Sequence, residues 1–354
     1  MAAVDRPYGP LMVGIAGEAL AEDEAEMLCH PGIGGVILFT RNYRSRSQLR
    51  ALCDAIHALR RPSLVIAVDH EGGRVQRFKE GFAALPAAAH YGMRYDIERE
   101  EGRRIAQAGG RVMAAELRAA GVDFSFAPAL DIDHGKSRVI GDRAFHREAE
   151  AVSVLARAFL AGMSEAGMAG VGKHFPGHGS VSEDSHLELP VDRRALEDIR
   201  TSDLLPFERL IASGDLTGVM PAHIVFERMD ESPAGFSRYW IDDILRKGLR
   251  FDGPVFSDDL DMGGAAGFGD HVARTAAALD AGCDMALICN DPAAAARVLD
   301  TLDPEAHPRR SARIARMQGS GGRSDFASLE KDHLYRAALD DLKSSIALEE
   351  SLSL

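Results

Sequence analysis

Short apolar runs alternate with longer amphipathic stretches along most of this 354-residue chain, and this alternation restricts the possible folds most strongly. The runs have the length of buried strands, and the stretches between them repeat apolar residues at helical spacing. A helix between two strands returns the chain to the same edge, so the strands pair in parallel. The runs are Leu11–Ile15, Gly35–Phe39, Leu64–Asp69, Phe124–Pro128, Gly170–His174, Thr217–Pro221, Pro254–Asp258 and Met285–Cys289.

About eight strand–helix units predict an α/β protein with a single (β/α)8 barrel over residues 1–305. An open doubly wound sheet is the rival fold, but its usual phosphate loops, GxGxxG and GxxxxGK[ST], do not occur. After the last unit, helical patterns resume at Ser311–Met317 and Leu329–Leu348. We expect residues 306–354 to form a C-terminal helical extension packed on the outside of the barrel. The expected barrel helices are Ser47–Leu59, Glu98–Ala120, Glu148–Ala166, Asp203–Ser213, Ile241–Leu249, Val272–Ala281 and Pro292–Leu302.

The composition restricts the kinds of molecule that this chain can bind. The formal net charge of −13 argues against nucleic acid or an anionic membrane as the main partner. No apolar run approaches the roughly 20 residues of a membrane span, and the first residues lack the pattern of a secretion signal. The four cysteines contain no CxxC pair, which favours buried reduced thiols. We therefore expect a cytoplasmic protein that acts on a small molecule.

Polar residues gather where the apolar runs end. In a barrel, the C-terminal ends of the strands share the catalytic face, so these side chains should meet. Each also has a structural interpretation, because a strand-terminal aspartate can cap the next helix and a lone histidine is often a hydrogen-bonded core residue. The candidates are Asp69 and Arg77 at and after run three, Lys173 and His174 in run five, His223 after run six, and Asp258 at the end of run seven.

The loop after run five, KHFPGHGSVSEDSHLELP, carries the densest set of titratable groups. Side chains two residues apart can converge in a turning segment, so Asp184 can orient the imidazole of His186. A paired carboxylate raises the proton affinity of the imidazole, which then serves as an acid and afterwards as a base. Glycines flank this dyad, so the loop could swing in after the substrate binds.

A metal site is the alternative for the same loop. His174 and His178 stand four residues apart, but Pro176 and Gly177 between them prevent the regular helix on which such a pair usually binds zinc. A metal-dependent barrel hydrolase would use His174, His178, His186 and His223.

Cleavage of a glycosidic bond requires a carboxylate below the anomeric carbon and a proton donor at the leaving oxygen. Asp258 suits the first role and His186 the second. The motif KHFPGHG-x4-DSH, with VDHEGGRVQRF before it and FSDDLDM after it, resembles the family 3 glycoside hydrolases. More narrowly, it is similar to the single-domain bacterial β-N-acetylhexosaminidases of cell-wall recycling. LFTRNY, SFAPALDI, VIGDRAF, MPAHI and DAGCDM add to the resemblance, which runs from about residue 9 to 302.

The resemblance implies a role for each matching residue. Asp258 would be the nucleophile of a retaining, exo-acting β-N-acetylglucosaminidase, and His186, supported by Asp184, would be its acid/base. The implied substrate is a muropeptide with terminal N-acetylglucosamine on 1,6-anhydro-N-acetylmuramic acid, cleaved by a monomer without metal or organic cofactor. A β-glucosidase or β-xylosidase of the same family is the nearer alternative. Residues implied to bind the sugar are Asp69, Arg77, Arg143, Lys173 and His174.

Overall fold

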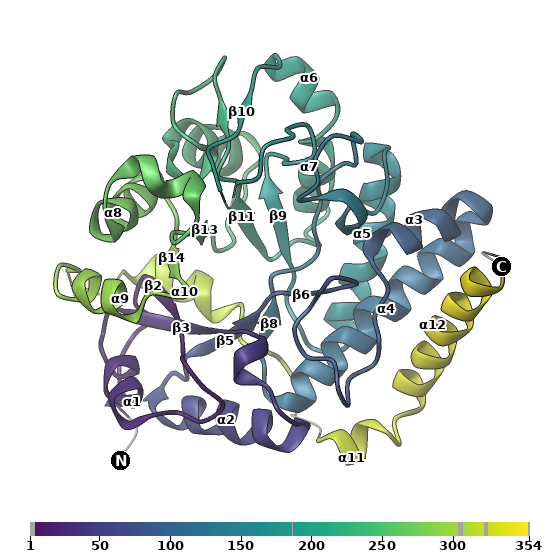
Figure 1. The fold of residues 1–354 in the computed structure, drawn as a ribbon, viewed down its shortest axis with the longest axis horizontal. Coiled ribbons are helices and arrows are strands. Elements are labelled where there is room, and N and C mark those ends of the chain that lie inside the picture. Colours follow the sequence, from purple (N-terminus) through teal and green to yellow (C-terminus); the bar gives the residue numbers. More distant parts are fainter. Residues whose placement is uncertain (1–3, 186, 304–306, 322–324, 353–354) are drawn as a thin grey trace.

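The computed structural model describes residues 4–185, 187–303, 307–321 and 325–352. Its central feature is a curled sheet of parallel strands with helices on its outer side (Figure 1). Each predicted apolar run overlaps one of these strands. They are β2 (Leu11–Gly14), β3 (Ile33–Leu38), β5 (Val65–Val68), β8 (Phe124–Ser125), β9 (Val171–Phe175), β11 (Gly218–Pro221), β13 (Phe256–Asp259) and β14 (Met285–Ile288).

The pairing order follows the chain. Six strands form one sheet in the order β13, β14, β2, β3, β5 and β8, and β9 pairs with β11. Isolated parallel bridges join Ser125 to Gly170 and Val219 to Val255, which link the two ends of the six-stranded sheet to the β9–β11 pair. The prediction of parallel strands is therefore confirmed, and the C-terminal ends of neighbouring strands lie on the same side. Smaller strands are β1 (Val4–Asp5), β4 (Arg60–Arg61), β6 (His70–Gly72), β7 (Val75–Gln76), β10 (Val191–Asp192) and β12 (Val225–Phe226).

The helices between strands form where the helical spacing predicts them, and their ends carry local signals. Glu98 accepts hydrogen bonds from the first turn of α4, and Gly121, with φ of 96°, ends that helix. Among the described helices that lie between strands, α1, α3 and α6 were not predicted. The helices are α1 (Glu22–Leu28), α2 (Arg46–Ala58), α3 (Ala88–Ile97), α4 (Arg99–Ala120), α5 (Ala149–Glu165), α6 (Leu196–Thr201), α7 (Leu205–Ala212), α8 (His271–Ala281), α9 (Pro292–Leu299) and the π-helix η4 (Tyr239–Gly248). Short 3-10 turns are Thr40–Asn42, Gly141–Arg143, Ala234–Phe236 and Gly263–Phe268.

The inside of the curled sheet is filled by aromatic side chains. Phe124, Phe126 and Phe256 are fully buried, with ring centroids 5.1 to 5.4 Å apart. Phe126 packs edge to face against both other rings, which combines large buried area with favourable quadrupole contacts. Phe126 also lines the cavity described below, so this cluster forms part of the cavity floor.

The C-terminal residues form α10 (Pro308–Ala315), α11 (Phe326–Leu329) and α12 (His333–Leu352). In Figure 1, α12 runs alongside α4 on the outside of the molecule. The Tyr335 hydroxyl donates a hydrogen bond of 2.8 Å to the buried carboxylate of Glu116, which also accepts from the backbone N–H of Ala83. Phe326 packs edge-on against Phe82. These contacts attach the C-terminal helices to the strand-and-helix core.

The burial of the cysteines and the lengths of the helices bear on the expectations from composition. Cys53, Cys283 and Cys289 are buried, as predicted, whereas Cys29 is only partly buried because it lies at the end of the short helix α1. Within the described ranges, no helix is long and apolar enough to cross a membrane.

Candidate active site

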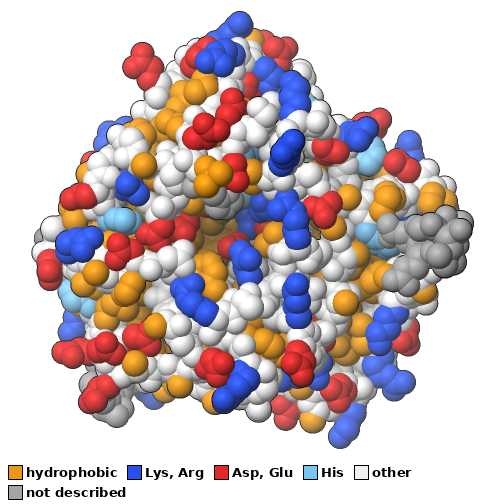
Figure 2. Space-filling model, in the orientation of Figure 1, with side chains coloured by type: hydrophobic (Ala, Val, Ile, Leu, Met, Phe, Trp, Pro, Cys, Tyr) orange, Lys and Arg blue, Asp and Glu red, His pale blue; other side chains and the backbone are white. Residues whose placement is uncertain are grey.

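A cavity of about 690 Å³ opens where the parallel strands end. Figure 2 shows this hollow near the centre of the molecular face, with Lys and Arg side chains on its rim. The loops after several strands contribute to it, which is the arrangement expected for a site built at the carboxyl ends of parallel strands. Among its lining residues are Asp69, Glu71, Arg77, Arg143, Lys173, His174, His178, Asp184, Ser185, Asp258 and Asp259.

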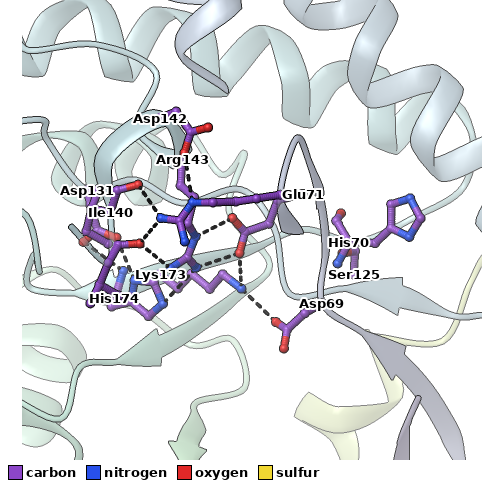
Figure 3. A network of polar contacts seen from close by, with 12 residues as sticks. Asp69, His70, Glu71, Ser125, Asp131, Ile140, Asp142, Arg143, Lys173 and His174 are labelled. Atoms are coloured by element: carbon purple, nitrogen blue, oxygen red, sulfur yellow. Dashed lines mark hydrogen bonds and ion pairs between the residues drawn. The ribbon is translucent and has the colours of Figure 1, made fainter. Parts of the chain in front are cut away.

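Four charged residues form a continuous network on one wall of the cavity (Figure 3). Lys173 Nζ lies 2.8 Å from Asp69 Oδ1 and 2.6 Å from Glu71 Oε1. Arg143 donates two hydrogen bonds to Glu71, of 2.8 Å from Nε and 2.7 Å from Nη2. Such two-point contacts between guanidinium and carboxylate set direction as well as charge. Glu71 therefore joins the two predicted cations into one unit.

Burial makes these charges interdependent. Taken alone, burial would raise the pKa of Glu71, but Arg143 and Lys173 together lower it well below its ordinary value. For Lys173, burial acts to lower the pKa, and the carboxylates of Asp69 and Glu71 reverse this and raise it. Glu71, Arg143 and Lys173 are thus charged near neutral pH. Of the four, Asp69 is the most exposed, with 24% of its side chain accessible, so it can also contact a ligand.

A second network radiates from Asp131, which is fully buried. Its Oδ2 lies 2.7 Å from His174 Nδ1, and its Oδ1 accepts hydrogen bonds from the backbone N–H groups of His174 and His178. Burial opposes the ionisation of Asp131, but the contacts with both histidines prevail and lower its pKa. His174 Nε2 then lies 3.5 Å from Arg143 Nη2, which connects the two networks.

The glycines of the loop after β9 let the chain turn close to its neighbours. Gly177 has φ of 145°, which disfavours any side chain. A Cβ atom at Gly179 would lie 1.8 Å from the carbonyl oxygen of Ile132. Lys173, His174 and His178 are therefore held by a backbone that only glycine permits at these two positions.

Asp258 lies near the end of β13 and lines the same cavity. Its side chain is half-buried, and its Oδ1 accepts a 2.8 Å hydrogen bond from the backbone N–H of Asp259. Burial, followed by the nearby charge of Asp261, raises the pKa of Asp259 to about 7.

Asp184 also lines the cavity, on the loop that follows β9. Its backbone carbonyl accepts hydrogen bonds from the N–H groups of Leu187 and Glu188, both 2.9 Å, so the chain makes a tight turn here. The proposed acid/base, His186, lies outside the described residues. Its role therefore stays a prediction from the sequence.

The structure brings most of the other predicted site residues to the cavity. Arg77 reaches to within 3.7 Å of Asp69. His223 differs, because it is fully buried and is not among the described residues that line the cavity. Its Nε2 lies 3.1 Å from the carbonyl oxygen of Asp259, and its ring stacks on Phe236. This is the geometry of a hydrogen-bonded core histidine beside β13.

Two charged residues of the site, Glu71 and Asp131, were given no role from the sequence, although Glu71 was noticed as a glutamate at a strand end. Glu71 stands two positions after Asp69, at the same strand end, and this position is the signal that could have identified it. Asp131 lies in the motif SFAPALDI but far from its histidine partners in sequence, so no local spacing indicates it. The described part of the chain contains no group of three or more His, Cys, Asp or Glu residues that could hold a metal ion.

Comparisons with known proteins agree with this geometry. Residues 6–317 match the profile of the Glycosyl hydrolase family 3 N terminal domain. A β-hexosaminidase of Thioalkalivibrio sulfidiphilus is 58% identical over 338 residues, covering 94% of this chain and 97% of the relative. The native structure of NagZ from Neisseria gonorrhoeae superimposes with a TM-score of 0.92 at 43% identity, over 97% of this chain and 99% of that one. The same Neisseria protein in complex with N-trifluoroacetyl-D-glucosamine gives a TM-score of 0.92 at 42% identity, over 98% of this chain and 99% of that one.

Proposed function

The chain belongs to glycosyl hydrolase family 3, and on that premise we propose that it is an exo-acting, retaining β-N-acetylglucosaminidase. Its relatives establish it as a glycoside hydrolase of the β-hexosaminidase type. The proposed substrate is a muropeptide in which terminal N-acetylglucosamine is linked to 1,6-anhydro-N-acetylmuramic acid. The proposed setting is cytoplasmic cell-wall recycling by a monomer that needs no metal or organic cofactor.

One observation carries the proposal: Asp258 and Asp184 line the same cavity as the charged wall formed by Asp69, Lys173 and Arg143. A retaining glycosidase needs a nucleophilic carboxylate on one side of the anomeric carbon and a proton donor at the leaving oxygen. Asp258 projects from the end of a rigid strand, which suits the nucleophile. The loop of Asp184 approaches the cavity from a different strand, β9, which suits the donor.

In the first step, Asp258 attacks the anomeric carbon while His186 protonates the departing oxygen, and a glycosyl ester forms on Asp258. In the second step, neutral His186 removes a proton from water, which attacks the anomeric carbon and releases Asp258. The configuration at the anomeric carbon is inverted twice and so retained. Asp184 would hold the His186 ring and stabilise its protonated form.

The charged wall is proposed to bind the N-acetylglucosamine ring. Asp69 would accept hydrogen bonds from sugar hydroxyls, and Lys173, Arg77, Arg143 and His174 would donate to them. Hydrogen bonds with one charged partner are the stronger kind. Because the anions and cations of the wall largely balance one another, the site suits a neutral sugar.

The isolated parallel bridges from Ser125 to Gly170 and from Val219 to Val255 support the interpretation of the curled sheet as a (β/α)8 barrel. We propose that residues 1–305 form this catalytic barrel and that residues 306–354 form the helical extension. The order of strands along the chain, each followed by a helix, is what this arrangement requires.

The test is hydrolysis of chromogenic N-acetyl-β-glucosaminide compared with the matching β-glucoside. We expect strong preference for the N-acetylated sugar, and equal turnover of both would contradict the assignment. A second measurement follows the anomer released first, by proton NMR. Initial appearance of the β-anomer supports retention, and initial appearance of the α-anomer would refute it.

A further inference from the structure

We propose that the side-chain contact between His178 and Ser185 anchors the acid/base loop, which makes Ser185 a positioning residue for the proton donor. This inference rests on the proposed function, because it concerns the delivery of the His186 side chain to the leaving oxygen. Ser185 stands between the two members of the proposed dyad in the chain.

Ser185 is buried, although residues close to it in the loop are exposed. Only 1% of Ser185 is accessible, whereas Ser182 and Glu188 are exposed and Leu187 is 80% exposed. A buried serine hydroxyl needs a hydrogen-bond partner, because leaving it unpaired costs about 1–3 kcal/mol. The Ser185 hydroxyl finds that partner in His178 Nε2, at 2.8 Å.

Ser185 is also held by the segment that follows another strand. Its backbone carbonyl oxygen accepts a 2.9 Å hydrogen bond from the N–H of Gly264. Gly264 follows β13, the strand that carries Asp258. Ser185 is therefore attached at once to the loop after β9, through His178, and to the segment after the nucleophile strand.

The partner of Ser185 is itself rigidly placed. The backbone N–H of His178 donates a 2.7 Å hydrogen bond to Asp131, the same carboxylate that orients His174. The rings of His178 and His174 pack edge to face, with centroids 5.7 Å apart. Burial, together with the nearby His174, lowers the pKa of His178 to about 4, so its ring is neutral near pH 7. A neutral imidazole can pair with a hydroxyl in either tautomer.

These contacts connect the sugar-binding wall to the proton donor. Asp131 holds His174 at the sugar site and His178 behind the loop, and His178 in turn holds Ser185. The backbone on both sides of Ser185 carries Asp184 and His186, so loss of the Ser185 hydroxyl should loosen the approach of the donor. The position of the Asp258 nucleophile should change little, because β13 holds it independently.

The experiment compares two N-acetyl-β-glucosaminides that differ only in leaving group. The 2,4-dinitrophenyl glycoside needs no proton at its leaving oxygen, whereas the phenyl glycoside does. For Ser185→Ala we expect kcat/KM to fall about tenfold or more with the phenyl glycoside and less than about threefold with the dinitrophenyl glycoside, since a positioned acid supplies about 10²- to 10⁴-fold. His178→Asn removes the other side of the contact and should cause the same selective loss.

Ser180→Ala is the matched control, because the Ser180 hydroxyl donates a 2.6 Å hydrogen bond to Asp192 within the same loop region. It should leave the ratio of the two substrates as in the parent enzyme. The double variant Ser185→Ala/His178→Asn should lose no more than either single variant, since both remove one contact. If Ser185→Ala does not fold, His178→Asn alone decides the question by the same ratio.

Equal losses with both glycosides, or additive losses in the double variant, would overturn the positioning role while leaving the proposed function intact. A parent enzyme that hydrolyses neither glycoside would overturn the proposed function and this inference with it.

Discussion

Replacing Glu71 by glutamine should destabilise the protein by about 3–5 kcal/mol at pH 7, because one partner of a buried ion cluster is removed. The side chains of Lys173 and Arg143 are only 3% and 10% exposed. In the variant, Lys173 keeps Asp69 as its anion, but Arg143 loses its paired carboxylate and keeps neutral acceptors, the new amide oxygen at position 71 and the carbonyl oxygen of Val139. A guanidinium buried without a carboxylate is the main source of the expected cost.

Urea unfolding followed by circular dichroism measures this change. Glu100→Gln is the matched control, because it makes the same substitution in an ion pair with Arg103 whose side chains are 74% and 51% exposed. Exposed pairs of this kind contribute about 0.2–1 kcal/mol. If Glu71→Gln lowered the free energy of unfolding by no more than Glu100→Gln does, the buried network would not carry the energy assigned to it.

The pH dependence of the unfolding free energy tests independently whether Glu71 is ionised in the folded protein. The pKa of Glu71 is lowered in the folded protein, so near pH 4.5 and below the unfolded state binds a proton that the folded state does not. The contribution of Glu71 is therefore fully present above that range and is lost as the pH falls. The stability difference between parent and Glu71→Gln should be constant near neutral pH and shrink below about pH 4.5. A difference that grows on acidification would contradict the charge assignment.

A double variant tests whether the side chains of Glu71 and Lys173 stabilise the protein through their mutual interaction. Glu71→Gln combined with Lys173→Met removes one anion and one cation, so the remaining charges of Asp69 and Arg143 still balance. We expect its loss of unfolding free energy to be smaller than the sum of the two single losses by about 0.5–3 kcal/mol. Additive losses would mean that the two side chains do not interact energetically.

Three further outcomes are expected. Asp258→Ala should keep the fold, seen by circular dichroism, and lower kcat by about 10³-fold or more, as loss of a nucleophile does; near-normal turnover would place the nucleophile elsewhere. Exhaustive chelation should leave the rate of N-acetyl-β-glucosaminide hydrolysis unchanged, because the proposed mechanism assigns both steps to Asp258 and His186. Activity lost to a chelator and restored by zinc would instead favour the metal-dependent alternative. The pKa of Asp259 is raised from its ordinary value of 3.8 to about 7. Between these two pH values the folded state binds a proton that the unfolded state does not. The contribution of Asp259 to stability therefore falls as the pH rises through that range. Asp259→Asn should flatten this fall in melting temperature, and an unchanged profile would show that Asp259 titrates normally.

The parallel strands could be predicted from the sequence because each is a short apolar run bounded by polar or glycine residues. Helices with a clear apolar face, such as α4 and α5, could be predicted equally well. Helix α1 was missed because only its last residue, Leu28, is buried, so its sequence, EDEAEML, shows no apolar stripe. The end of the third strand shows a similar limit for the site, since Asp69 was assigned a role there, whereas Glu71 was noticed but assigned none.

The contacts that organise the site join residues far apart in the chain. Asp131 binds His174 across 43 residues and His178 across 47, and neither separation has a helical or strand period that a sequence pattern could reveal. His174 and His178 were weighed as a zinc pair because of their own spacing. In the folded chain, their backbone N–H groups instead converge on one buried carboxylate.

Asp131 accepts hydrogen bonds from the backbone N–H groups of both histidines and also contacts the ring of His174. The other ring nitrogen of His174 faces Arg143, and the ring of His178 contacts Ser185. The proposed sugar-binding residues and the loop proposed to supply the proton thus share one buried anchor. A substitution at Asp131, such as Asp131→Asn, should therefore impair substrate affinity and proton delivery together, whereas Ser185→Ala should impair proton delivery alone.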